Sequence, residues 1–225
     1  MLQDGIVDRY LVEHCPDRRF RLCHHRSELP RDADAFFWGG DGTVFNKLGR
    51  FKDLDGEMRT IVIESLRAYP TWQAEMALAA VGRQLVRVAT GEGVVNTIWH
   101  SYAIVEKFTP SAVAGMRAAR QQRGELDFAA LNLVHRPVAL GAMLLLLPLI
   151  AFGLRRDGWS DVAALAGITA GALLANAVVC GILSNPHDRY GARLAWIAPL
   201  VIALAVCRLR ERAATGADKP ATARA

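Results

Sequence analysis

The sequence predicts an all-α integral membrane protein in which a polar helical region precedes three transmembrane helices. Two long uncharged runs carry this prediction, Pro137–Leu154 with 18 residues and Val162–Pro186 with 25. A helix needs about 20 mainly apolar residues to cross the hydrocarbon core of a bilayer. A third run, Leu194–Cys207, has only 14 residues. The flanking Arg193 and Arg208 can extend their charged ends to the headgroups, which lengthens this span.

The chain therefore divides into three regions of different composition. We expect a polar helical region over residues 1–136, a membrane region over 137–208 and a disordered basic tail over 209–225. The three spans are expected at about 137–154, 162–186 and 190–208. The net charge of +5 is modest, and the arginines are scattered or flank apolar runs rather than alternating with aromatic residues. This pattern favours contact with a lipid bilayer and disfavours a nucleic-acid partner.

Within residues 1–136 the apolar periodicity is helical and strand-like alternation is scarce. Residues 15–50 are dense in Cys, Pro, Gly and Asp and are expected to be irregular, with a turn at Gly39–Gly42. The segment Val94–Val105 is apolar and aromatic but too short to span, so it is expected at the membrane interface. The other helices are expected at residues 1–14, 54–69, 72–90 and 109–123.

Cys15 and Cys23 are the only cysteines in the polar region. In an oxidising compartment they can form a disulfide that closes a small loop, and in the cytosol they would remain free thiols. Three histidines lie nearby, but their spacing from the cysteines is not that of a standard zinc site. We expect no metal and no cofactor.

Basic residues near the span ends are almost balanced between the two sides. Arg155 and Arg156 in the first loop favour the same orientation as the dense basic group after the third span. Basic residues near the other span ends favour the opposite orientation. Because basic residues concentrate in cytoplasmic loops, we expect the first loop and the tail in the cytoplasm and residues 1–136 outside. The start of the sequence carries no export signal. This predicts either a cytoplasmic polar region or the C-terminal part of a larger polytopic protein.

The second span carries small residues every four positions, Ala163, Gly167, Gly171 and Ala175. This spacing places them on one helix face and permits close contact with another helix. The pattern fits general packing between membrane helices, and it also fits a specific seam with other membrane helices or with a second copy of the chain.

The loop before the third span holds the best candidate for chemistry. It contains His187, Asp188, Arg189, Tyr190 and Arg193. Asp188 has the chemistry of a general base or of an ion-pair partner, and Arg193 that of a phosphate or carboxylate ligand. The alternative is a turn whose tyrosine and arginines lie among the headgroups.

Asp188-Arg189-Tyr190, followed by an apolar run containing Pro199, resembles the last segments of polytopic glycosyltransferases that use lipid-linked sugars. The stretches Cys15-Pro16-Asp17 and Phe37-Trp38-Gly39 also resemble uncharacterised proteobacterial membrane proteins. These resemblances imply a multi-pass protein of the bacterial inner membrane in cell-envelope biogenesis, of unassigned activity. The alternatives are part of a glycosyltransferase, whose catalytic acid in an early loop this chain lacks, and a packing subunit of a membrane complex.

Overall fold

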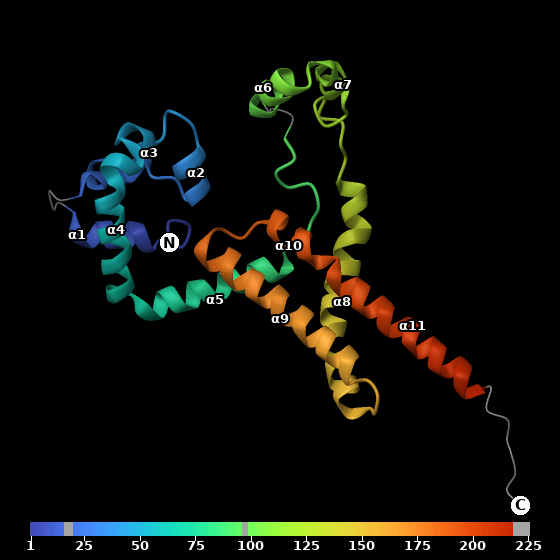
Figure 1. Ribbon diagram of the computed structural model, residues 1–225. Coiled ribbons are helices and arrows are strands. Elements are labelled where there is room, and N and C mark those ends of the chain that lie inside the picture. The colour runs from blue at the N-terminus through green and yellow to red at the C-terminus, as the bar shows by residue number, and fades with distance from the viewer. Residues whose placement is uncertain (16–19, 96–98, 218–225) are drawn as a thin grey trace, which may run out of the picture. The chain divides into compact units, whose positions relative to one another are not determined.

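The computed structural model describes residues 1–15, 20–95 and 99–217, and within these ranges every regular element is a helix (Figure 1). The predicted all-α class is confirmed. The chain forms two compact units, Met1–Gly82 with Gly181–Asn185, and Arg83–Cys180 with Pro186–Ala225. In chain order the elements are α1 (Ile6–His14), η1 (Arg21–Glu28), α2 (Ala33–Trp38), α3 (Val44–Lys47), α4 (Arg50–Ala68), α5 (Pro70–Val86), α6 (Trp99–Phe108), η2 (Pro110–Ala112), α7 (Val113–Ala118), α8 (Ala129–Arg155), α9 (Ser160–Leu183), α10 (Asp188–Ala195) and α11 (Ile197–Ala217).

The first unit has its own apolar core. Tyr10 and Leu11 of α1 pack with Phe45 of α3 and with Leu54 and Ile61 of α4, and all five are at most 2% exposed. A disulfide joins Cys15 to Cys23 beside this core. The disulfide and the packing of the core side chains stabilise a folded unit built from short helices.

Residues 15–50 are less irregular than the composition predicts. They contain the 3₁₀ helix η1 and the short helices α2 and α3. The side chain of Asp32 accepts a hydrogen bond from the Ala35 N–H at 2.7 Å, and Thr43 accepts one from Asn46 at 3.3 Å. Each bond satisfies an otherwise unpaired donor at the start of a helix. Composition did not predict these elements because helices of 4 to 8 residues are too short to show a helical periodicity.

Three helical segments of the described residues are long and apolar enough to cross a membrane: Ala129–Arg155, Ser160–Leu183 and Asp188–Ala214. The prediction of three candidate spans is confirmed by length and composition, and these helices indicate a multi-pass membrane protein. α8 continues through Pro148 as one helix. The third segment is divided at Trp196 into α10 and α11. Pro199 has no N–H to donate to the Ala195 carbonyl four residues earlier, which accounts for the break.

Small side chains bring the three segments together. Ala142 and Leu146 of α8 contribute to one buried cluster, together with Ala166 and Leu173 of α9 and Ala198 of α11. Small residues permit close backbone approach, which supplies most of the packing energy where lipid offers no hydrophobic driving force.

The predicted small-residue face of α9 is divided by this packing. Ala163 is buried, and a Cβ built at Gly153 of α8 would lie 2.8 Å from its methyl carbon. Gly167 is half-buried, whereas Gly171 and Ala175 are exposed. A Cβ at either glycine would meet nothing within 4 Å. Among the described residues, the Ala163 end of the face is therefore packed and the Gly171 end is open.

The loop between α8 and α9 is held by two arginines of α11. Arg208 and Arg212 each donate to the Gly158 carbonyl at 2.7 Å, and both guanidinium groups lie 5.3 Å from the centre of the buried Trp159 ring. Arg208 also forms an ion pair with Asp161. These contacts require a helix beyond the span, and α11 indeed continues through Ala217, into the segment 209–225 that the sequence predicted as a disordered tail. The last residues of that segment, 218–225, lie outside the described ranges.

Candidate functional site

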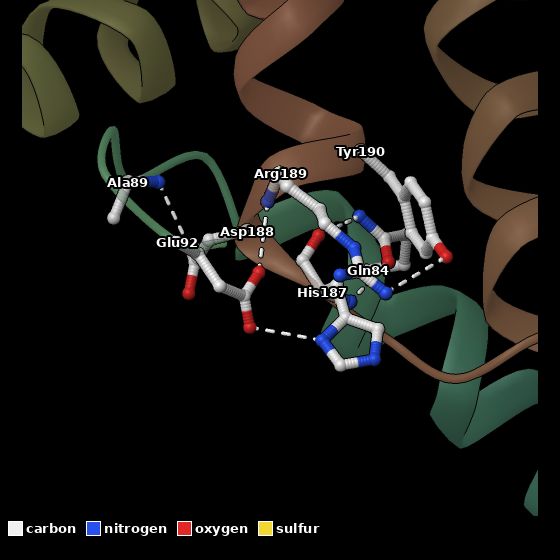
Figure 2. A network of polar contacts seen from close by, with 7 residues as sticks. All are labelled: Gln84, Ala89, Glu92, His187, Asp188, Arg189 and Tyr190. Atoms are coloured by element: carbon white, nitrogen blue, oxygen red, sulfur yellow. Dashed lines mark hydrogen bonds and ion pairs between the residues drawn. The ribbon is translucent and has the colours of Figure 1, made fainter. Parts of the chain in front are cut away.

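The predicted polar loop lies in a network that joins two segments about a hundred residues apart. We call this network the polar junction, and Figure 2 shows its members. One side is the stretch at the end of α5 and just after it, and the other is the start of α10. The members are Gln84, Ala89, Glu92, His187, Asp188, Arg189 and Tyr190.

Gln84 binds the backbone of His187 in both directions. Its amide nitrogen donates to the His187 carbonyl at 2.9 Å, and its amide oxygen accepts from the His187 N–H at 2.8 Å. The Gln84 side chain suits this role because an amide offers a donor and an acceptor together. The residue is 1% exposed. A buried polar side chain with both of its groups bonded in this way holds the two segments together.

The two carboxylates of the junction each accept from the opposite segment. Asp188 Oδ1 accepts the Ala89 N–H at 2.8 Å, and Glu92 Oε2 accepts the Arg189 N–H at 2.8 Å. The other Glu92 oxygen lies 2.9 Å from His187 Nδ1. Because a carboxylate only accepts, that ring nitrogen carries the proton.

Glu92 also lies at the N-terminal end of α10, where helix N–H groups lack intrahelical partners and favour negative charge. Partial burial by itself would raise the pKa of the Glu92 carboxyl. The hydrogen bonds from the His187 ring and the Arg189 N–H outweigh burial, so the pKa of Glu92 lies below its ordinary value. Glu92 is therefore an anion at neutral pH, and it holds the start of α10 in that form.

The remaining predicted residues are arranged differently. The guanidinium of Arg189 lies 5.1 Å from the centre of the Tyr190 ring, and its Nη2 lies 3.4 Å from the Tyr190 hydroxyl. Arg193 is exposed, and its carbonyl accepts the Trp196 indole N–H at 2.9 Å. Four of the five residues predicted in this loop thus belong to the junction, and Arg193 lies one turn beyond it.

The segment Val88–Thr90 is fastened to α8 as well. Asn132 accepts the Thr90 N–H at 2.8 Å and donates to the Thr90 carbonyl at 2.9 Å. His135 Nε2 lies 2.8 Å from the Val88 carbonyl, which can only accept. Asn132 thus repeats the two-way amide pairing of Gln84, and the segment is held between the first two turns of α8 and the first turn of α10.

Gly191 allows α10 to approach this segment closely. A Cβ at this position would lie 1.9 Å from the Arg87 carbonyl oxygen and 3.0 Å from its carbonyl carbon. Real Cβ atoms do not approach backbone atoms so closely, so the packing of α10 on the segment requires glycine here.

This arrangement has limited capacity for acid–base chemistry. Asp188, the predicted base, accepts a backbone N–H, and Glu92 accepts two hydrogen bonds. In the described ranges, no group of three or more His, Cys, Asp or Glu side chains is placed to hold a metal ion. Comparison with protein-family models, with curated proteins and with solved structures found no match to this chain. The resemblance to glycosyltransferases remains a prediction based on a few residues.

Sequence reasoning missed half of the junction. Gln84 falls within the helix predicted over 72–90, and Glu92 lies between Gly91 and Gly93 just after it, outside the predicted polar loop. A single acid between two glycines was a usable signal, since this pattern exposes backbone and carboxylate together. The pairing with residues about 95 positions away had no local signature.

Proposed function

We propose that this chain is a multi-pass anchor protein of a bacterial inner membrane, active in cell-envelope biogenesis as a scaffold. In this proposal the polar junction is structural and fixes the segment Gln84–Glu92 to the ends of two spans. The observation that carries it is that Asp188 and Glu92 each accept a backbone N–H from the opposite segment. A catalytic carboxylate must reach a substrate proton, whereas a carboxylate that only accepts structural hydrogen bonds needs no such access.

Two substitutions at Asp188 separate the structural role from a catalytic one. Asp188→Asn keeps an oxygen that accepts the Ala89 N–H, whereas Asp188→Ala removes it. In a deletion strain challenged with detergent, we expect Asp188→Asn to restore envelope integrity as the wild-type protein does. We expect Asp188→Ala to fail and to expose residues 86–95 to protease. Loss of function in a stably folded Asp188→Asn protein would refute the structural role and favour proton transfer at Asp188.

We also propose that residues 1–128 lie outside the cytoplasm and that the Arg208–Arg212 end lies within it. Three passes put the junction and the end of α11 on opposite sides. Two features support this orientation: the basic cluster around Trp159 suits the cytoplasmic face, and the disulfide suits an oxidising compartment. A fluorescent protein fused after Ala225 should fluoresce. Activity of an alkaline phosphatase fused at the same position would show that this end lies outside the cytoplasm and would contradict the proposed orientation.

A second candidate function is that of a packing subunit in a membrane complex. It is favoured by the open space at Gly167 and Gly171, where a Cβ would meet no atom of the described residues within 4 Å. Gly171→Leu should weaken association with another membrane helix while leaving the monomer stable. Gly141→Leu is the matched control, because a Cβ at Gly141 of α8 also meets nothing within 4 Å and the residue lies outside the predicted face. Equal effects of the two substitutions would contradict a specific seam.

A further inference from the structure

The helices α6, η2 and α7 form a small lobe without a core. No side chain described between Ser101 and Ala118 is buried. α6 has 10 residues and α7 has 6. Isolated helices shorter than about 12–15 residues are marginal in water, and most helical stability comes from covering an apolar face. These helices therefore require a surface that covers them.

The lobe has an inner side and an outer side. On the inner side the Tyr102 hydroxyl donates to Gln122 at 2.7 Å, and the guanidinium of Arg117 lies 5.5 Å from the centre of the Tyr102 ring. On the other side of α6, Ile104 is 60% exposed and Phe108 is 72% exposed. Residues four apart lie on one helix face, so these two side chains form a single apolar ridge.

Both ends of the lobe's segment are fixed close to the start of a membrane span. Before the lobe, Thr90 is bonded to Asn132 of α8. After it, the ten residues between α7 and α8 can reach at most about 35 Å when fully extended. Asn132 lies five positions before the uncharged run that begins at Pro137, which is roughly 7 Å of helix. The lobe is thereby kept within about 35 Å of the start of α8, which is within reach of the bilayer surface.

The charged residues around the ridge indicate what kind of surface the lobe binds. Between residues 99 and 123 the basic side chains are Lys107, Arg117, Arg120 and Arg123, and the acidic one is Glu106. Arg123 is paired with Glu125 at 2.7 Å, which leaves a positive excess. Basic side chains beside exposed apolar ones are typical of segments that lie in the interface of an anionic membrane.

We infer that the α6–α7 lobe binds the surface of the membrane that α8 enters, with Ile104 and Phe108 inserted between the headgroups of anionic lipids. The ridge supplies buried apolar area, and the basic residues supply attraction to lipid phosphate. This binding is independent of the role proposed for the polar junction. It gives the loop between α5 and α8 a second attachment, to lipid rather than to protein.

The test uses the full chain with Cys180→Ser and Cys207→Ser, reconstituted into phosphatidylcholine vesicles with or without phosphatidylglycerol. Single cysteines at Phe108 and, as the matched control, at Glu106 receive an environment-sensitive fluorophore. Glu106 is exposed and points about 200° away from Phe108 on α6. Because the lobe has no core, neither substitution removes buried contacts.

With phosphatidylglycerol present, the Phe108→Cys label should be quenched by a nitroxide placed near the lipid headgroups. Iodide in the water should quench it several-fold less than the Glu106→Cys label. Equal iodide quenching of the two labels would overturn the inference. Equal protection of the Phe108 label without phosphatidylglycerol would overturn the assignment to anionic lipid. Protection in native membranes but not in either vesicle would overturn the inference in favour of a protein partner.

Discussion

Gly191→Ala tests whether the polar junction depends on close backbone packing. The added Cβ would lie 1.9 Å from the Arg87 carbonyl oxygen and 3.4 Å from a Val88 methyl carbon. Carbon and carbonyl oxygen normally approach no closer than about 3.3 Å, so one segment must move by more than 1 Å. The segment that contains Arg87 cannot move freely, because its next two residues are held: the Val88 carbonyl is bonded to His135 and the Ala89 N–H to Asp188.

Overpacking of this kind typically costs about 1–3 kcal/mol, and the fixed carbonyl puts this substitution at the upper end. Gly167→Ala is the matched control: it makes the same chemical change within a span, at a position where the Cβ meets nothing within 4 Å. Alanine is favoured over glycine inside helices by up to about 1 kcal/mol, so the control should be neutral or slightly stabilising. Denaturation of the purified proteins in mild detergent measures both. Equal stability of the two variants would refute the close packing of α10 on the Arg87 segment.

Three further perturbations address other contacts. The lowered pKa of Glu92 means that its contribution is present above the unfolded pKa of about 4.3 and is lost as the pH falls through the folded value. Protease resistance of residues 86–95 should therefore fall on acidification below about pH 4.3, and Glu92→Gln should flatten that change. Cys23→Ser opens the loop from Cys15 and should destabilise the first unit by about 2.5 kcal/mol in chemical denaturation; an unchanged midpoint would contradict this. Trp159→Leu removes the ring beneath Arg208 and should increase deuterium exchange between α8 and α9, whereas Trp159→Phe should preserve most of the protection.

The parts of the fold that follow from local chemistry were predictable. Lipid requires long uncharged helices, so the runs beginning at Pro137 and Val162 indicated two spans by length alone. The third needed Arg193 and Arg208 in addition, and the structure extends it further, to a segment ending at Ala214. The buried face of α9 was less accessible to prediction, because small residues occupy several faces of that helix and only packing selects among them.

The candidate site shows more clearly what the sequence alone does not predict. The polar loop stood out because several polar and ionisable side chains cluster within a few residues next to a predicted span. Its partner Gln84 is an ordinary residue in a helix, as is Asn132, which fastens Thr90 to α8, and the role of both depends on a fold that brings distant segments together. A sequence can indicate that polar groups near a membrane need partners, but it does not identify them when the partners are about a hundred positions away.

That separation has a consequence for how the protein is made. Gln84 binds the backbone of His187, 103 positions later in the chain. A ribosome therefore synthesises α5, the lobe and two complete spans before the second half of the junction exists. Until then Gln84 has no His187 backbone to pair with, and a polar side chain that will later be buried remains hydrated. The junction can therefore close only after the first two spans have been synthesised, and a chain stalled before His187 would lack this fastening.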